Sequence, residues 1–229
     1  MVKLKENIRC YSNPVQREIL IGLLDNDTIR NNFFLTGGTA LSVFYLHHRS
    51  SIDLDLFNIE KSIMGDIYLW ITHRWPGESK QINQNEYLLQ MLIKGVKVDI
   101  VHDPLSFMEK REKYHLDGDK FLTVDSLRNI AAGKLNAMVS RREIKDFLDF
   151  FFINKMVKGM DLETIYKDAR KKEGMFDDSP MVAYHLENNL NILKQNPYAF
   201  PDLFVDFDLD EFYRFYEELV FKIYHRIDK

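Results

Sequence analysis

The feature that most constrains this chain is a pair of glycines between two short apolar segments. Residues 33–35 are apolar and lead into Gly37 and Gly38, and residues 38–47 then have the apolar spacing of a helix. A second apolar segment covers residues 52–57. Glycine tolerates the tight turn that joins a strand to a helix. The order therefore predicts a strand, a glycine turn, a helix, a brief polar loop and a second strand.

The second of these strands carries two carboxylates two residues apart, Asp53 and Asp55. Because successive strand side chains alternate between faces, we expect both acids on one face and Ile52, Leu54 and Leu56 on the other. Carboxylates held this close repel each other unless a positive charge lies between them. Mg²⁺ or Mn²⁺ is the simplest such charge, since hard divalent ions prefer oxygen ligands. The N–H groups of the glycine turn, where a helix begins, predict a binding site for phosphate.

A third aspartate, Asp99, lies in the later apolar segment 96–101. If this strand lies beside residues 52–57, Asp99 completes a triad of acids with Asp53 and Asp55. Such a triad can hold two metal ions, one that orients a triphosphate and one that lowers the pKa of an attacking hydroxyl. Asp99 is also the natural general base for that hydroxyl. A phosphate seat beside metal-binding carboxylates predicts metal-assisted chemistry on a nucleotide.

Each of these pieces has a simpler explanation when taken alone. An Asp-x-Asp pair is common on solvated edge strands, a Gly-Gly pair is often only a turn, and a single strand aspartate is often a surface residue. The joint pattern is more specific than its parts. It is neither a Walker loop nor a dinucleotide fingerprint, because the sequence lacks both Gly-x-x-x-x-Gly-Lys and Gly-x-Gly-x-x-Gly.

The remainder of the first half is of mixed character. We expect helices over residues 14–24 and 61–75, and a hairpin of two strands over 86–94 and 96–102. Residues 114–123, with an Asp-Gly-Asp in the middle, predict an irregular or edge segment.

Beyond Asp125 the pattern becomes helical. Amphipathic helices are predicted over residues 126–138, 142–156, 162–172, 180–194 and 210–227. Breaks are predicted at Gly159, at 174–180 and at 196–197. We therefore predict an α+β protein with a nucleotide-handling α/β domain, a mixed sheet flanked by helices, at residues 1–124. A helical bundle follows at residues 125–229.

Composition limits the class of protein. A hydrophobic content of 45% in 229 residues is enough for a real core, and a net charge of −4 argues against a broad nucleic-acid surface. One cysteine, Cys10, excludes an internal disulfide and a cysteine-based zinc site, which fits a reducing cytosol. No apolar run reaches the ~20 residues of a membrane span, and the N-terminus lacks a signal core. We expect a cytoplasmic protein with no membrane partner.

Two blocks of the chain resemble the AbiEii/AbiGii-type nucleotidyltransferase toxins of the polymerase-β-like nucleotidyltransferase superfamily. Residues 37–41 and 49–57 are similar to the family's Gly-Gly-Thr-Ala-Leu and Arg-x-Ser-x-Asp-Leu-Asp signature. Residues 130–138 and 141–149 are similar to its helical block, Lys-Leu-x-Ala followed by Arg and by Lys/Arg-Asp. The resemblance spans roughly residues 33–150 and leaves the C-terminal helices without a matching motif.

The resemblance implies roles for individual residues. It assigns the metal ions to the three aspartates above and the triphosphate to the turn of Gly37, Gly38 and Thr39. The segment between this turn and the first aspartate is slightly longer than in the wider superfamily. This difference leaves open whether Gly38 or Thr39 contacts the phosphate. Arg49 and Ser51 would either bind a phosphate or brace the loop.

The helical block adds further candidates. By resemblance, Lys134 would neutralise triphosphate charge, as lysines do at other phosphoryl sites; without the resemblance it is a solvated helix lysine. Lys145 and Asp146 lie close to the active site in the family and are secondary candidates. Because Asp146 and Asp149 share a helix face, ion pairs with Arg142 or Lys145 are the structural alternative.

Two other groups of residues have a plain structural explanation. Phe147 and the three phenylalanines at 150–152 are predicted to be core instead of a platform for base stacking. The basic runs at 110–113 and 170–172 are predicted to be solvated. They would contact phosphates only if the acceptor is RNA.

The activity implied by the resemblance is a metal-dependent transfer of a nucleoside monophosphate from an NTP to an acceptor hydroxyl. The acceptor would be an RNA, such as a tRNA 3′ end, or a protein, with Mg²⁺ or Mn²⁺ as cofactor. The chain would be the toxin of a toxin–antitoxin or phage-defence pair, with an antitoxin protein as partner. The alternatives are a small-molecule, antibiotic-type nucleotidyltransferase and a non-catalytic nucleotide- or partner-binding module. The intact triad of acids counts against the binding module.

Overall fold

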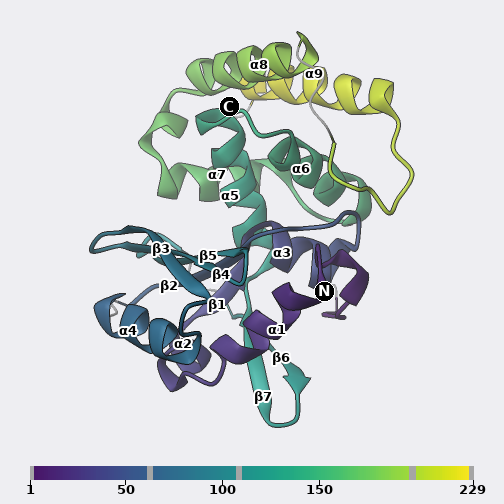
Figure 1. The fold of residues 1–229 in the computed structure, drawn as a ribbon. Helices are drawn as coiled ribbons and strands as arrows, with labels where there is room; N and C mark the ends of the chain where they lie inside the picture. Colours follow the sequence, from purple (N-terminus) through teal and green to yellow (C-terminus); the bar gives the residue numbers. More distant parts are fainter. Residues whose placement is uncertain (1–2, 61–63, 107–109, 196–199, 227–229) are drawn as a thin grey trace. The chain divides into compact units, whose positions relative to one another are not determined.

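The structure is a computed structural model that describes residues 3–60, 64–106, 110–195 and 200–226. The chain divides into two compact units, Met1–Ser126 and Leu127–Lys229. The first unit holds a sheet with its helices, and the second is helical (Figure 1). The predicted α+β class is confirmed. The assignment of a nucleotide-handling role to residues 1–124 stays a prediction.

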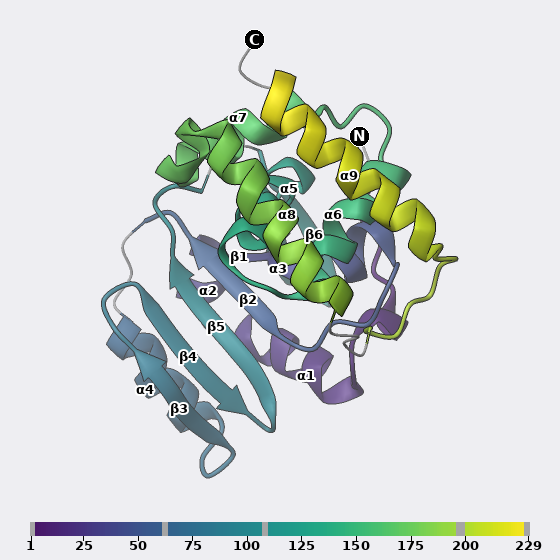
Figure 2. The same cartoon turned by 90° about the horizontal axis from the view of Figure 1, so that it is seen from above.

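Seven strands of the described chain form one mixed sheet in the order β3-β4-β5-β2-β1-β7-β6. The strands are β1 Phe34–Thr36, β2 Leu54–Asn58, β3 Ser79–Gln84, β4 Leu88–Ile93, β5 Val96–His102, β6 Glu112–Asp117 and β7 Lys120–Val124. β2 is antiparallel to β1 and parallel to β5, and β1 is parallel to β7. Figure 2 shows β4, β5 and β2 side by side. The predicted hairpin of β4 and β5 is confirmed.

The helices of the first unit are η1 Ile8–Cys10, α1 Pro14–Leu23, α2 Asp27–Asn32, α3 Gly37–Ala40, η2 Leu41–Leu46 and α4 Met64–Arg74. Helix α1 begins as its sequence predicts, because Asn13 accepts a hydrogen bond from the N–H of Gln16 and Pro14 takes the first turn. The helix predicted over 38–47 has two parts, since the α-helical turn α3 continues as the π-helical η2. The predicted start of α4, at 61–63, lies outside the described residues.

The two faces of the sheet differ as the alternation predicts. Leu54 and Leu56 of β2 and Val98 and Ile100 of β5 are fully buried, while the residues between them are partly exposed. Ile52 is the exception, because it is 60% exposed and does not share the buried face. The reason is that β2 begins only at Leu54, so the strand alternation does not reach Ile52.

The prediction of an irregular or edge segment at residues 114–123 is confirmed for β6 and wrong for β7. These residues belong to an antiparallel hairpin of β6 and β7 that turns at Gly118, whose φ is 52°, and the register of the pair shifts between His115 and Asp117. Only β6 lies at the edge of the sheet, since β7 pairs with β1. The loop between the paired residues Asp117 and Lys120 is Gly118-Asp119, and glycine at the first loop position is a hairpin signal that explains the turn.

Strand β3 was not predicted, because its sequence is polar. It has no apolar alternation, and most of its residues are exposed. Its strand conformation depends on hydrogen-bonded pairing with β4, which a single-sequence pattern does not reveal.

The second unit contains the predicted helices. They are α5 Leu127–Ser140, α6 Ile144–Met156, α7 Leu162–Lys172, η3 Gly174–Asp177, α8 Ser179–Gln195 and α9 Leu209–Arg226. The short 3₁₀ helix η3 lies in the predicted break at 174–180, whereas the break predicted at 196–197 lies outside the described residues. In the described chain, no helix combines the length and apolar character needed to cross a membrane.

Aromatic side chains fill the centre of the second unit. Phe147 and the phenylalanines at 150–152 are buried, which confirms that they are core residues. The rings of Phe151 and Phe212, from α6 and α9, lie 5.5 Å apart between centroids. Tyr216 of α9 is fully buried in this cluster, and its hydroxyl donates to the carbonyl of Phe147 at 2.5 Å.

Tyr216→Phe should lower the free energy of unfolding by about 1–2 kcal/mol, because it removes a hydrogen bond that is fully buried. Urea denaturation followed by circular dichroism measures this change. Tyr184→Phe is the matched control, since Tyr184 is 61% exposed and should lose nothing measurable. Equal losses in both variants would show that the Tyr216 hydroxyl has no stabilising role.

Candidate active site

One row of side chains that crosses the sheet is entirely polar. Parallel β2 and β5 align Asp55 with Asp99, while β4 aligns Gln90 with Asp99 and β1 aligns Thr36 with Asp55. We call these four residues the polar rung. Aligned residues on neighbouring strands point to the same face of a sheet. The two carboxylates therefore lie side by side on the face opposite the apolar core, and the strand pairing that the triad required is present.

Asp53 lies just before β2 and is partly buried. Its backbone carbonyl accepts a hydrogen bond from Gln16 Nε2 at 3.1 Å and another from Thr39 Oγ1. Both donor residues are fully buried, so α1 and α3 fix the backbone at Asp53. Sequence reasoning missed Gln16. The signal that could have found it is a polar residue one turn before Ile19 on the apolar face of α1.

Lys97 supplies positive charge to the acids. Its Nζ lies 2.7 Å from Asp99 Oδ2, and Gln90 Nε2 donates to Asp99 Oδ1 at 3.1 Å. Burial pushes the pKa of Lys97 down, but the hydrogen bond to Asp99 and the negative charges of Asp99, Asp53 and Asp55 outweigh burial, so the pKa is raised. The negative charges of all three acids thus favour the protonated form of Lys97.

The carboxylates around the Lys97 ammonium are groups of the kind that bind a divalent cation. Within the part of the chain that the structure describes, no three His, Cys, Asp or Glu side chains converge closely enough to enclose a metal ion. Asp53, Asp55 and Asp99 are nevertheless carboxylates whose combined field already attracts the cationic group of Lys97. Carboxylate oxygens are the ligands that Mg²⁺ and Mn²⁺ prefer.

The glycine turn lies against the acids for steric reasons. Gly37 has a φ of 68°, which residues other than glycine rarely adopt, and a Cβ at this position would overlap Asp55 Oδ2. A Cβ at Gly38 would collide with Arg49 Nη2 and lie 3.2 Å from Ser51 Oγ. Gly37 therefore lets the backbone pass directly over the Asp55 carboxylate, and Gly38 lets it pass close to Arg49 and Ser51.

Arg49, Ser51 and Thr39 brace this turn, and all three are buried. Thr39 Oγ1 lies 2.9 Å from Ser51 Oγ, Arg49 Nη1 donates to the carbonyl of Ser50 at 2.7 Å, and the N–H of Ser51 donates to the carbonyl of Cys10 at 2.9 Å. Of the two roles left open for Arg49 and Ser51, these contacts support bracing. The hydroxyl of Thr39 is likewise engaged within the loop. A contact of Gly38 or Thr39 with phosphate stays a prediction.

A buried carboxylate beside the polar rung was missed by sequence reasoning. Asp125 directly follows β7 and accepts hydrogen bonds from Thr36 Oγ1 at 2.7 Å and Arg111 Nε at 2.8 Å. The Arg111 side chain is 9% exposed, and its guanidinium lies 3.7 Å from the centre of the Phe34 ring. The prediction of a solvated run at 110–113 is therefore wrong for Arg111, because pairing with Asp125 and stacking on Phe34 compensate its burial.

Lys134 belongs to a buried ion network of the second unit. Its Nζ lies 2.8 Å from Asp146 Oδ1 and 2.6 Å from Asp149 Oδ2, and Arg141 Nε lies 2.7 Å from Asp146 Oδ2. Both carboxylates are fully buried. Burial pushes the pKa of Asp146 up, but Lys134 and Arg141 outweigh it, so the pKa is lowered. The interpretation of Lys134 as a solvated lysine is therefore wrong.

The partners predicted for Asp146 also need correction. Asp146 pairs with Lys134 and Arg141, whereas Arg142 Nε donates to Asn189 at 3.2 Å. Lys145 is partly buried on α6. Roles for Lys134, Lys145 and Asp146 toward a nucleotide stay predictions.

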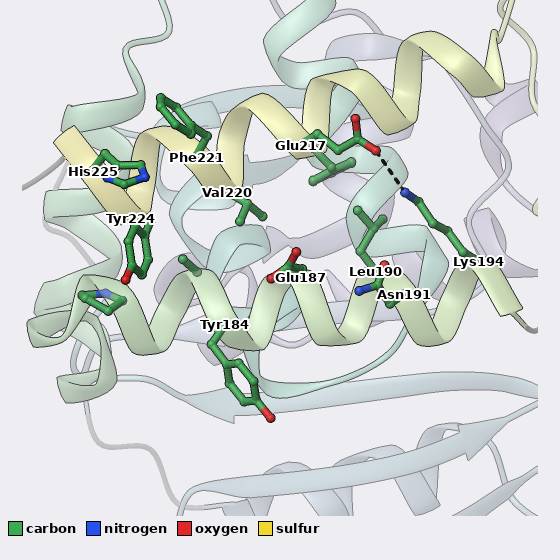
Figure 3. Close-up of a pocket in the computed structure, with 13 residues that line it drawn as sticks. Tyr184, Glu187, Leu190, Asn191, Lys194, Glu217, Val220, Phe221, Tyr224 and His225 are labelled. Carbon is green, nitrogen blue, oxygen red and sulfur yellow. Dashed lines mark hydrogen bonds and ion pairs between the residues drawn. The ribbon is translucent and has the colours of Figure 1, made fainter.

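A groove lies between α8 and α9 in the second unit (Figure 3). Its volume is about 440 Å³, and its walls include Tyr184, Leu190 and Phe221. The ion pair of Lys194 and Glu217, at 3.3 Å, closes one side. Among the described residues that line it, none is a predicted site residue, so the groove is not the candidate active site.

Gly37→Ala should destabilise the first unit more than Gly118→Ala does. Both glycines have positive φ, so each alanine costs about 1–2 kcal/mol in backbone strain. The Cβ at 118 meets open space, whereas the Cβ at 37 overlaps Asp55 and adds about 1–3 kcal/mol. Urea denaturation of both variants measures the difference, and equal losses would show that the turn does not press on Asp55.

Lys134→Met should lower the free energy of unfolding by about 3–5 kcal/mol, because it leaves buried carboxylates without their lysine. Lys158→Met, at an exposed position of the same unit, is the matched control and should change little.

The same variant should also change the pH dependence. The lowered pKa of Asp146 contributes stability that is present above the ordinary value of about 3.9 and is lost as pH falls through the folded pKa. In Lys134→Met this loss should begin at a higher pH, as denaturation curves between pH 3 and 7 would show. An unchanged pH profile would exclude Lys134 as the group that lowers the pKa.

Comparison with known proteins gives a consistent picture. Residues 18–213 match the family described as nucleotidyl transferase AbiEii toxin, type IV TA system. Over 188 residues the chain is 31% identical to "uncharacterized protein aq_aa25" of Aquifex aeolicus strain VF5, covering 80% of this chain and 82% of that one.

Two solved structures share the fold. One is JHP933 from Helicobacter pylori, with a TM-score of 0.53, 16% identity and coverage of 98% of this chain and 95% of that one. The other is MenT4, a nucleotidyltransferase toxin from Mycobacterium tuberculosis, with a TM-score of 0.52, 16% identity and coverage of 94% and 82%. The resemblance in the two motif blocks is therefore confirmed, and the chain is a nucleotidyltransferase that belongs to the AbiEii toxin family.

Proposed function

We propose that this nucleotidyltransferase transfers a nucleoside monophosphate from an NTP to a hydroxyl of an RNA, such as a tRNA 3′ end, with Mg²⁺ or Mn²⁺ as cofactor. The observation that carries the proposal is the alignment of Asp55 with Asp99 on the partly exposed face of the sheet, with Gly37 against Asp55. Asp53, fixed at its backbone, supplies the third carboxylate.

The residues of the first unit divide the chemistry among them. Asp53, Asp55 and Asp99 hold the divalent ions, which when bound polarise the triphosphate and lower the pKa of the attacking hydroxyl. The backbone N–H groups of Gly37 and Gly38, where α3 begins, would face the triphosphate. Asp99 accepts the proton of the acceptor hydroxyl as its oxygen bonds to the α-phosphorus, and pyrophosphate leaves with the electron pair of the broken P–O bond.

We further propose that the chain is the toxin of a toxin–antitoxin or phage-defence pair with an antitoxin protein as its partner. Membership of the AbiEii toxin family supports this role. The similarity to the fold of MenT4, itself a nucleotidyltransferase toxin, agrees with it.

Incubation of the full chain with α-³²P-labelled NTPs, Mg²⁺ and total RNA should transfer label to RNA. Asp55→Asn and Asp99→Asn should each reduce the rate by about 10²–10⁴-fold, because each removes a group that acts on the reacting atoms. Asp119→Asn, at an exposed acid of the same unit, is the matched control and should retain full activity.

The fate of the label decides between the alternatives. Label in the protein fraction alone would replace RNA by a protein acceptor, and label on an aminoglycoside alone would favour the small-molecule enzyme. Nucleotide binding without release of pyrophosphate in any fraction would contradict the proposed transfer. Transfer that is unchanged in Asp55→Asn would contradict the proposed site.

A further inference from the structure

We propose that Lys97 is a built-in counter-ion of the acid cluster, which holds Asp99 in place until a divalent metal ion displaces the ammonium. This inference rests on the proposed function, because it takes Asp53, Asp55 and Asp99 as the metal ligands. Lys97 is thus a positioning residue that tunes metal binding.

The hydrogen bonds of Asp99 carry the inference. Lys97 lies two residues before Asp99 on β5, so both side chains point to the same face of the sheet. Lys97 Nζ contacts Oδ2 at 2.7 Å, while Gln90 Nε2 donates to Oδ1 at 3.1 Å. Both carboxylate oxygens of Asp99 are therefore engaged. A cation that binds through Oδ2 has to take the place of the ammonium.

The exposure of the pair allows such an exchange. The Lys97 side chain is 38% exposed and that of Asp99 is 15% exposed. The ammonium can therefore leave Asp99 for water on its flexible four-carbon stem, whereas Asp99 stays in the sheet. An ion pair with this exposure contributes little energy, so a divalent ion can compete with it.

The charge of the cluster explains why a lysine is needed at this position. Asp53 and Asp55 also attract the Lys97 ammonium, in addition to its direct contact with Asp99. Three carboxylates without a cation repel one another, which would spread them apart. A tethered ammonium keeps the ligands together before the metal arrives, at the cost of competing with the metal.

The sheet offers a matched control for this lysine. Lys80 of β3 pairs with Leu92 of β4, which pairs with Lys97, so Lys80 and Lys97 lie on one row of the sheet. Lys80 is exposed at the far end of this row. Lys80→Met therefore removes the same charge as Lys97→Met without touching Asp99.

The test is Mn²⁺ binding to the full chain without nucleotide, measured by electron paramagnetic resonance of the free ion. Lys97→Met should bind Mn²⁺ about three- to ten-fold more tightly, the effect expected when a competing unit charge a few ångströms away is removed in a water-exposed site. Lys97→Arg, which keeps the charge, and Lys80→Met should both stay within about two-fold of the wild type.

Thermal unfolding gives a second measurement that needs no activity. In EDTA, Lys97→Met should melt about 2–4 °C below the wild type, because the carboxylates lose their counter-ion. Saturating Mn²⁺ should remove this deficit. Lys80→Met should show neither change.

The outcomes separate this inference from the proposed function. If Asp55→Asn abolishes Mn²⁺ binding while Lys97→Met binds no more tightly than the wild type, the counter-ion role is wrong and the metal site stands. If Asp55→Asn binds Mn²⁺ as the wild type does, the metal ion lies elsewhere and both proposals fail.

Discussion

The register between parallel strands β2 and β5 is the constraint on which the candidate site depends. It places Asp55 opposite Asp99 on one face of the sheet. The same register buries Leu54 and Leu56 with Val98 on the other face. A slip of one residue would turn every side chain of the strand to the opposite face, so burial of the apolar residues also determines where the acids lie. Burial of apolar side chains on one face of the sheet thus positions Asp55 and Asp99 on the other face.

A second set of constraints acts on the chain around these strands. Asp53 precedes β2, so no sheet pairing holds its backbone; buried donors from Gln16 and Thr39 do so instead. Gly37 gives the turn enough room to pass over Asp55. Buried polar contacts of this kind are costly to break, because each broken contact leaves an unsatisfied group away from water. Buried side chains of α1 and α3 therefore hold the backbone that presents Asp53.

Much of this arrangement could be predicted from local patterns. The helix α1, the apolar alternation of β2 and β5, and the helices of the second half follow from spacing alone, and the structure confirms them. The family resemblance rests on residues within two short blocks, and the match over residues 18–213 confirms it.

The features that escaped prediction depend on partners distant in sequence. Strand β3 forms because β4 offers hydrogen bonds, not because its polar sequence favours a strand. Arg111 belongs to a basic run whose sequence predicts a solvated segment, but in the fold it pairs with Asp125 and stacks on Phe34. A charge pattern reveals which groups attract each other only when the fold has brought them together, which is why buried ion pairs are poorly predicted from a single sequence.

The two clusters of aspartates in this chain show why neighbouring carboxylates are not enough to bind a metal ion. Asp146 and Asp149 are fully buried and paired with Lys134, so no water-borne cation has a path or an electrostatic reason to enter. Asp99, by contrast, is paired with Lys97, whose side chain is itself partly exposed. The first arrangement is a permanent part of the core, because breaking it would leave charges stranded away from water. The second can exchange its cation at little cost, and that exchangeability is what distinguishes a site from a structural ion network.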